Sequence, residues 1–146
     1  MQIWAGFERL ILALWVGGMV AIGYIVAPVL FALLDDRTLA GSLAGVLFSA
    51  IAWLGIACGI LLLIIDRQLR PDTAMINWRS GILIAMLVLI LLGQFIVSPR
   101  IVELRGAGLA DSASFAWMHG LASLLFVLTS LLGLILVAAG TGMGRK

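Results

Sequence analysis

Four long apolar segments constrain the fold of this chain more than any other feature. They cover residues 10–34, 41–65, 80–98 and 115–139, and most of the charged residues stand outside them. Each segment is close to the roughly 20 residues that a helix needs to cross the hydrocarbon core of a bilayer. Such continuous runs lack the alternation of a barrel strand, so helices are the only choice. The sequence predicts an all-α fold, an antiparallel four-helix bundle that forms one integral membrane domain over residues 1–146.

The composition agrees with this class and excludes others. Hydrophobic residues make up 64% of the chain and charged residues 11%, whereas soluble domains have about 45–50% and about 25%. The one cysteine, Cys58, lies inside an apolar segment and cannot form an intramolecular disulfide. No basic run or aromatic-rich basic patch is present, so we expect the lipid bilayer as the surrounding partner and no nucleic acid.

Basic residues outside the spans predict the orientation. With four spans, both termini and the connection between the second and third spans lie on one side of the membrane. That side carries Arg9, Arg67, Arg70, Arg79, Arg145 and Lys146, and the other side carries Arg37, Arg100 and Arg105. Because cytoplasmic loops carry the excess of Lys and Arg, the larger set places both termini in the cytoplasm.

Small residues at helical spacing predict close contacts between helices. Lipid tails are as apolar as leucine, so membrane helices gain by close packing rather than by the hydrophobic effect. The candidates are Gly17, Ala21, Gly41, Gly45, Gly55 and Gly59. We expect them to pack inside one bundle, and the alternative is an interface between copies of the chain, for which the glycine pairs of the second span are the candidates.

Polar residues gather in the half of the membrane opposite the termini. The candidates for a polar pocket there are His119, Gln94, Ser98, Tyr24, Pro28, Ser123 and Arg100. We expect Pro28 to free a carbonyl near residue 24 and bend the first span, and Pro99 to end the third. Ionisable and amide groups at membrane depth often mark sites. His119 is therefore either a binding or proton-handling residue, or a structural hydrogen-bond donor that locks the packing.

No enzyme signature is present, and we expect no catalytic residue and no cofactor. The chain contains no HExxH, GxSxG, Walker or GxGxxG motif. His119 is the single histidine and the only plausible metal ligand, so two-histidine haem ligation would need a dimer. The carboxylates Glu8, Asp66 and Asp111 are expected at span ends or in loops, where they would give no proton path through the membrane.

Three stretches carry a resemblance to a known family. They are "LWVGGMVAIGYIVAPVLFALL" in the first span, "FIVSPRIVELR" at the end of the third and "FAWMHGLASLLFVLTSLLGLIL" in the fourth. They resemble the transmembrane-protein-205-like family, also catalogued as domain of unknown function 4149, over nearly the whole chain. The family pattern falls on Gly17, Ala27, Pro28, Phe31, Pro99, Arg105, Phe115, His119 and Gly120. Members often carry an intramembrane asparagine where this chain has Phe126.

The resemblance implies a four-helix membrane domain and suggests metal or drug handling. The compact chain is typical of a bacterial member, which places it in the cell inner (plasma) membrane. Three hypotheses follow. The first is a non-enzymatic membrane component that self-associates or binds other membrane proteins. The second is a transporter or metal- or drug-handling protein that uses the pocket around His119, and the third is a haem-linked oxidoreductase subunit.

Overall fold

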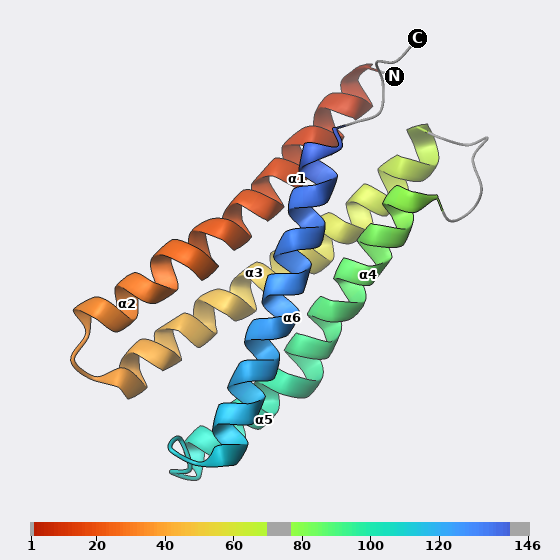
Figure 1. Ribbon diagram of the computed structural model, residues 1–146. Coiled ribbons are helices and arrows are strands. Elements are labelled where there is room, and N and C mark those ends of the chain that lie inside the picture. Colours follow the sequence, from red (N-terminus) through yellow and green to blue (C-terminus); the bar gives the residue numbers. More distant parts are fainter. Residues whose placement is uncertain (1, 70–76, 141–146) are drawn as a thin grey trace.

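Four long helical rods lie side by side in the computed structural model, which describes residues 2–69 and 77–140 (Figure 1). The first rod comprises α1 (Gln2–Ala21), the π-helical turn η1 (Ile22–Val26) and α2 (Ala27–Leu33). The second rod is α3 (Arg37–Leu69). The third comprises α4 (Trp78–Leu92), the π-helical turn η2 (Gly93–Val97) and α5 (Ser98–Gly106), and the fourth is α6 (Ala113–Ala138). The predicted all-α bundle of four long apolar helices is confirmed.

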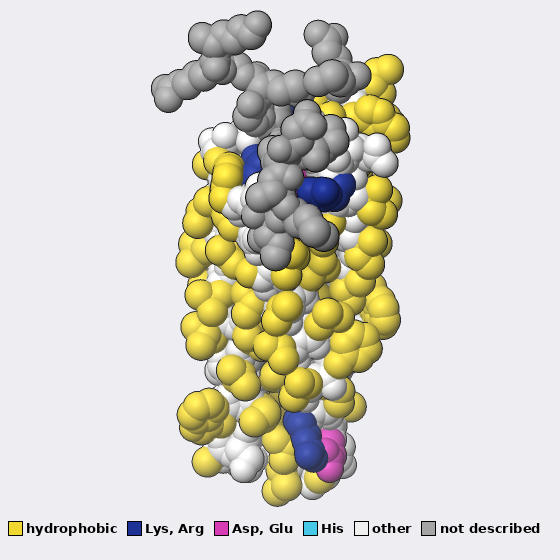
Figure 2. All heavy atoms as spheres, turned by 90° about the vertical axis from the view of Figure 1, so that its right-hand side faces the viewer, with side chains coloured by type: hydrophobic (Ala, Val, Ile, Leu, Met, Phe, Trp, Pro, Cys, Tyr) yellow, Lys and Arg dark blue, Asp and Glu magenta, His cyan; other side chains and the backbone are white. Residues whose placement is uncertain are grey.

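All four rods are long and apolar enough to cross a membrane. The longest, α3, has 33 residues, which gives about 50 Å at 1.5 Å per residue and exceeds the roughly 30 Å hydrocarbon core. Figure 2 shows a broad apolar band on one face, with charged side chains towards its two ends. The protein is therefore a multi-pass membrane protein whose outer side chains contact lipid.

The bundle has two distinct ends, the termini end and the loop end. The termini end holds the start of α1, the end of α6 and the ends of α3 and α4 that face each other across residues 70–76. The loop end holds residues 34–36, which join α2 to α3, and residues 107–112, which join α5 to α6. Polar side chains cap the two helices that start at the loop end. Asp36 accepts bonds from the amides of Thr38 and Leu39, and Ser112 accepts one from Phe115.

Two prolines inside the rods each follow a π-helical turn. Proline has no N–H and its ring clashes with the carbonyl four residues earlier. The turn before it widens instead, so that Ala27 N–H bonds to Ile22 O and Ser98 N–H bonds to Gly93 O. The helix then continues as α2 after Pro28 and as α5 after Pro99. The prediction that Pro99 ends the third span was wrong, because the π turn accommodates the proline ring.

The first two rods and the last two rods repeat one another. When Pro28 is placed on Pro99, η1 falls on η2 along its whole length. The same register places the fully buried Trp15 on the fully buried Met86. In the second rod of each pair, placing Gly59 on Gly133 also places the buried Leu62 on the buried Leu136. The chain therefore folds as two equivalent helical hairpins, one formed by the first two rods and one by α4, η2, α5 and α6.

Reciprocal glycine contacts hold the two hairpins together. A Cβ on Gly59 of α3 would lie 2.6 Å from Leu87 Cδ2 of α4, and a Cβ on Gly133 of α6 would lie 2.8 Å from Val16 Cγ2 of α1. Val16 and Leu87 occupy equivalent positions in the repeat. Because each hairpin uses its glycine against the same position of the other, the two are related by an approximate twofold axis along the bundle. Close backbone approach of this kind is the main source of helix association in a bilayer.

Replacement of Gly59 or Gly133 by alanine should destabilise the bundle. The added methyl would press against Cδ2 and Cγ of Leu87 or against Cγ2 of Val16, both short branched side chains with little freedom to move aside. We expect each change to cost about 1–3 kcal/mol, the usual range for overpacking. Thermal unfolding in a mild detergent measures it. Gly45→Ala and Gly120→Ala are matched controls, because open space surrounds both positions. Equal melting temperatures for all four variants would contradict the reciprocal contact.

Candidate functional site

His119 lies on the outward-facing side of α6, near the loop end. Its imidazole stacks on the ring of Phe115, with centroids 6.2 Å apart and planes 6° from parallel. Its backbone carbonyl accepts a bond from the Ser123 hydroxyl at 2.9 Å. The side chains of His119 and Ser123 are both exposed. In a membrane this position brings the imidazole into contact with lipid rather than with the bundle interior.

Gln94 makes the polar link between hairpins at membrane depth. It belongs to η2, and its Nε2 donates to Ser49 Oγ of α3 at 2.9 Å. Both residues are partly buried. Such interhelical bonds in bilayers contribute about 0.6 kcal/mol on average. Gln94 therefore joins the third rod to the second, and no hydrogen bond or ring contact among the described residues joins it to His119.

Tyr24 belongs to an aromatic cluster around the first π turn. Phe126 of α6 covers Gly23 so closely that no side chain fits there. The Phe126 ring meets Phe48 edge-on at 5.0 Å and Tyr24 at 6.1 Å. The Phe126 ring thus fills the space between α6 and η1.

The remaining predicted pocket residues stand apart from these three groups. Pro28 is exposed and Ser98 is partly buried in the first turn of α5. Arg100 is exposed and pairs with Glu103 one turn further on, at 2.9 Å. The structure therefore distributes the predicted residues over separate contacts along the loop-end half of the bundle.

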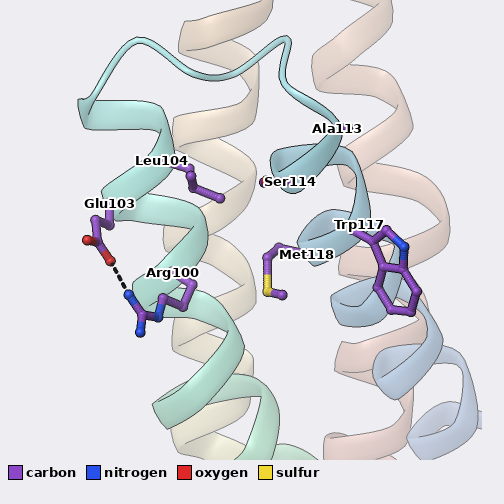
Figure 3. Close-up of a pocket in the computed structure, with 7 residues that line it drawn as sticks. All are labelled: Arg100, Glu103, Leu104, Ala113, Ser114, Trp117 and Met118. Carbon is purple, nitrogen blue, oxygen red and sulfur yellow. Dashed lines mark hydrogen bonds and ion pairs between the residues drawn. The ribbon is translucent and has the colours of Figure 1, made fainter.

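A groove of about 420 Å³ separates α5 from the start of α6 (Figure 3). Seven residues line it: Arg100, Glu103 and Leu104 from α5, and Ala113, Ser114, Trp117 and Met118 from α6. In the close-up, Met118 points across the gap towards α5, and the Arg100–Glu103 pair stands on the outer side of that helix. Of the residues predicted for a polar pocket, only Arg100 is among those that line this groove.

The six predicted packing residues divide into three kinds. Gly55 and Gly59 are buried, and they leave room for the Trp15 indole and for Leu87. Gly41 leaves room for the Arg105 guanidinium, whose Nη2 lies 3.1 Å from where a Cβ would stand. The others, Gly17, Ala21 and Gly45, face outwards.

A second groove, of about 430 Å³, runs along the outside of the bundle between the first rod and α6. Its lining is wholly apolar: Ala13, Val16, Gly17, Val20, Ala21 and Ile25 on one side, and Leu134 and Val137 on the other. Three of these residues are small and lie at a spacing of one helical turn. The equivalent positions of α4 hold Ile84, Val88 and Leu92, so the two hairpins differ strongly on this face.

A buried ionic cluster closes the termini end, and the sequence interpretation missed it. Glu8 is 3% exposed and Arg79 is 5% exposed. Arg79 Nη2 donates to Glu8 Oε1 at 2.9 Å, and Nη1 donates to the carbonyl of Gly140 just after α6. Beside this pair, Asn77 Nδ2 donates to the buried Asp66 of α3 at 2.7 Å. These bonds tie all four rods together at one end.

Glu8 and Arg79 occupy equivalent positions of the two hairpins. They therefore approach each other across the approximate twofold axis, where two like charges would repel. In sequence both residues flank apolar segments, which is the usual place for solvated charges. The signal that could have revealed the pair was the opposite charge at matching positions before the repeated "IVAP" and "IVSP" motifs.

We examined whether side chains that could bind a metal ion lie close together. Within residues 2–69 and 77–140, no three His, Cys, Asp or Glu side chains gather in a way that could hold a metal ion. His119 has an aromatic ring, not a second ligand, as its recorded side-chain neighbour.

The family of the chain follows from its sequence match. The pattern described as "Domain of unknown function (DUF4149)" matches residues 10–110. The chain belongs to the DUF4149 family. The match begins inside α1, continues through the third rod and ends before α6, so His119 and the α6 side of both grooves lie outside it. No curated protein and no solved structure matches this DUF4149 chain.

Loss of Arg79 should destabilise the protein far more than loss of an exposed arginine. Arg79→Ala leaves the buried Glu8 carboxylate without its guanidinium, a change that costs about 3–5 kcal/mol in buried pairs. Arg100→Ala removes an ion pair whose side chains are 68% and 66% exposed, which costs at most about 1 kcal/mol. Thermal unfolding of both variants in one detergent gives the comparison. The double variant Glu8→Gln/Arg79→Gln should lose less than the sum of the losses in the single variants Glu8→Gln and Arg79→Gln, and additive losses would show that the charges are not coupled.

Proposed function

We propose that this DUF4149 protein is a non-enzymatic membrane component that associates with a second copy of itself inside the bilayer. The observation that supports this most is the outward-facing groove between the first rod and α6. Its floor is formed by Ala13, Gly17 and Ala21, and its far wall by Leu134 and Val137. A row of small residues lets a second helix approach closely enough for extensive van der Waals contact.

The comparison of the hairpins strengthens this proposal. On α4, Ile84, Val88 and Leu92 fill the space that Ala13, Gly17 and Ala21 leave open on α1. These large residues are exposed to lipid, which is the ordinary state of an outer face in a membrane. Only one of two otherwise equivalent faces therefore carries the narrow, small-residue surface that suits a partner helix.

The transport alternative has weaker support. It depends on a polar pocket that combines His119 and Gln94, whereas these residues contact Phe115 and Ser49 respectively. Binding of a different membrane protein remains compatible with the same groove, and the experiment below distinguishes it from self-association.

Substitution of Gly17 by valine should weaken self-association. Valine is the residue at the equivalent position of α4, and it would fill the floor of the groove while remaining compatible with a lipid-facing helix. Energy transfer between donor- and acceptor-labelled copies in lipid vesicles measures association at a series of protein-to-lipid ratios. We expect the apparent dissociation constant to rise about tenfold for a loss of about 1.4 kcal/mol.

Gly45→Val is the matched control, because Gly45 also faces outwards with open space around it but does not line the groove. Unchanged transfer in Gly17→Val, or an equal loss in Gly45→Val, would contradict the proposal. Wild-type copies that show no transfer above a random distribution would exclude self-association and leave another protein as the occupant.

We also propose that the protein lies in the cell inner membrane with both termini in the cytoplasm. The excess of Arg and Lys at the termini end supports this orientation. A reporter enzyme that is active only in the cytoplasm, fused after Lys146, should be active. A second reporter that is active only in the periplasm should be inactive at the same site, and the reverse pattern would overturn the orientation.

A further inference from the structure

The groove between α5 and α6 exists because the two hairpins differ at the loop end. Residues 34–36 make a short connection in the first hairpin, whereas residues 107–112 make a longer one in the second. In the repeat register, Arg100, Glu103 and Leu104 correspond to Val29, Ala32 and Leu33. At its loop end the second hairpin thus has a charged pair and a longer connection, whereas the first hairpin has apolar residues and a shorter connection.

The rim of this groove carries one positive and one negative group side by side. Arg100 Nη1 donates to Glu103 Oε2 at 2.9 Å. That bond uses one of the five N–H donors of the guanidinium and one of the two carboxylate oxygens. Both side chains are about two-thirds exposed. The remaining donors of Arg100 and the other oxygen of Glu103 can therefore bind an outside group that carries both charges.

Apolar side chains line the gap on both sides of the charged pair's height: Leu104 lies nearer the loop end than the pair, and Met118 lies level with Arg100 (Figure 3). Leu104 and Met118 face the gap from the two helices (Figure 3). Trp117 is 72% exposed on the same turn of α6, and tryptophan is enriched where the hydrocarbon core meets the headgroups. The Arg100–Glu103 pair therefore lies at about the height of Trp117, where headgroups meet the hydrocarbon core (Figure 3).

We propose that the α5–α6 groove binds one phospholipid with an ethanolamine headgroup. The phosphate accepts hydrogen bonds from Arg100, and the primary ammonium donates to Glu103. An acyl chain runs past Met118 towards the middle of the membrane, and Leu104 lines the gap on the loop-end side of the headgroup. A choline headgroup carries the same charges but has no N–H to donate, and a glycerol headgroup has no cation for Glu103. The site thus favours ethanolamine through its carboxylate, and the inference does not depend on self-association.

Native mass spectrometry of the full-length protein tests the proposal. The protein is extracted gently and equilibrated with equal amounts of phosphatidylethanolamine, phosphatidylcholine and phosphatidylglycerol that carry identical acyl chains. We expect the wild type to retain one phosphatidylethanolamine in preference to the other two. Glu103→Gln should lower the ratio of ethanolamine to choline lipid about threefold, the effect of losing one exposed charge-assisted bond. Arg100→Gln should lower retention of all three lipids.

A second pair of variants tests the groove itself. Ser114→Phe places a ring in the gap between α5 and α6 and should abolish retention. Ala116→Phe adds the same ring to an exposed position of α6 that does not line the groove, and should retain lipid as the wild type does. Equal retention of the three lipids by the wild type would overturn the proposal, as would a preference for phosphatidylglycerol. Because Glu103 is exposed and its replacement leaves the fold intact, an unchanged lipid ratio in Glu103→Gln would also overturn it.

Discussion

The continuity of the backbone hydrogen-bond ladder is the constraint on which the rest of this bundle depends. In the hydrocarbon core no water can satisfy a free N–H or C=O, so each rod must bond its own backbone along its length. Pro28 and Pro99 interrupt that ladder, and each is accommodated by a π turn that bonds Ala27 to Ile22 or Ser98 to Gly93. Because the rods continue past the prolines, α2 and α5 extend to the loop end, where α5 forms one wall of a groove.

Matching contacts between the two repeated hairpins explain how four apolar helices pack in one defined arrangement. Lipid and leucine are alike to a membrane helix, so side-chain hydrophobicity cannot choose the partner. Shape complementarity therefore determines which helices pack together, through the contacts of Gly59 with Leu87 and of Gly133 with Val16. Polar contacts between the hairpins add to this at both ends of the bundle. Glu8 and Arg79 meet across the axis at the termini end, and Gln94 reaches Ser49 nearer the loop end.

The two proposed binding surfaces lie where equivalent positions of the two hairpins carry different residues. Small residues on α1 replace large ones on α4 and open a surface for a helix. A charged pair and a longer connection in the second hairpin open the α5–α6 groove, at a height where headgroups lie. Two nearly equivalent hairpins thus present different surfaces, one that we propose for a second copy of the chain and one that we propose for a lipid. Physical differences between equivalent positions identify these surfaces without reference to any catalytic group.

The sequence by itself determined the number of spans, the helical class and the family, because a bilayer imposes length and apolarity on every crossing segment. It also predicted Gly55 and Gly59 as packing positions, since small residues at helical spacing leave a visible pattern. Only the tertiary structure decided which face of each helix turns inwards. An all-apolar helix shows no amphipathic stripe, so the outward position of His119, the inward position of Glu8 and Arg79, and the groove beside Gly17 could not be derived from periodicity. They depend on contacts between rods, and those contacts are set by the fit of glycines to side chains far away in the chain.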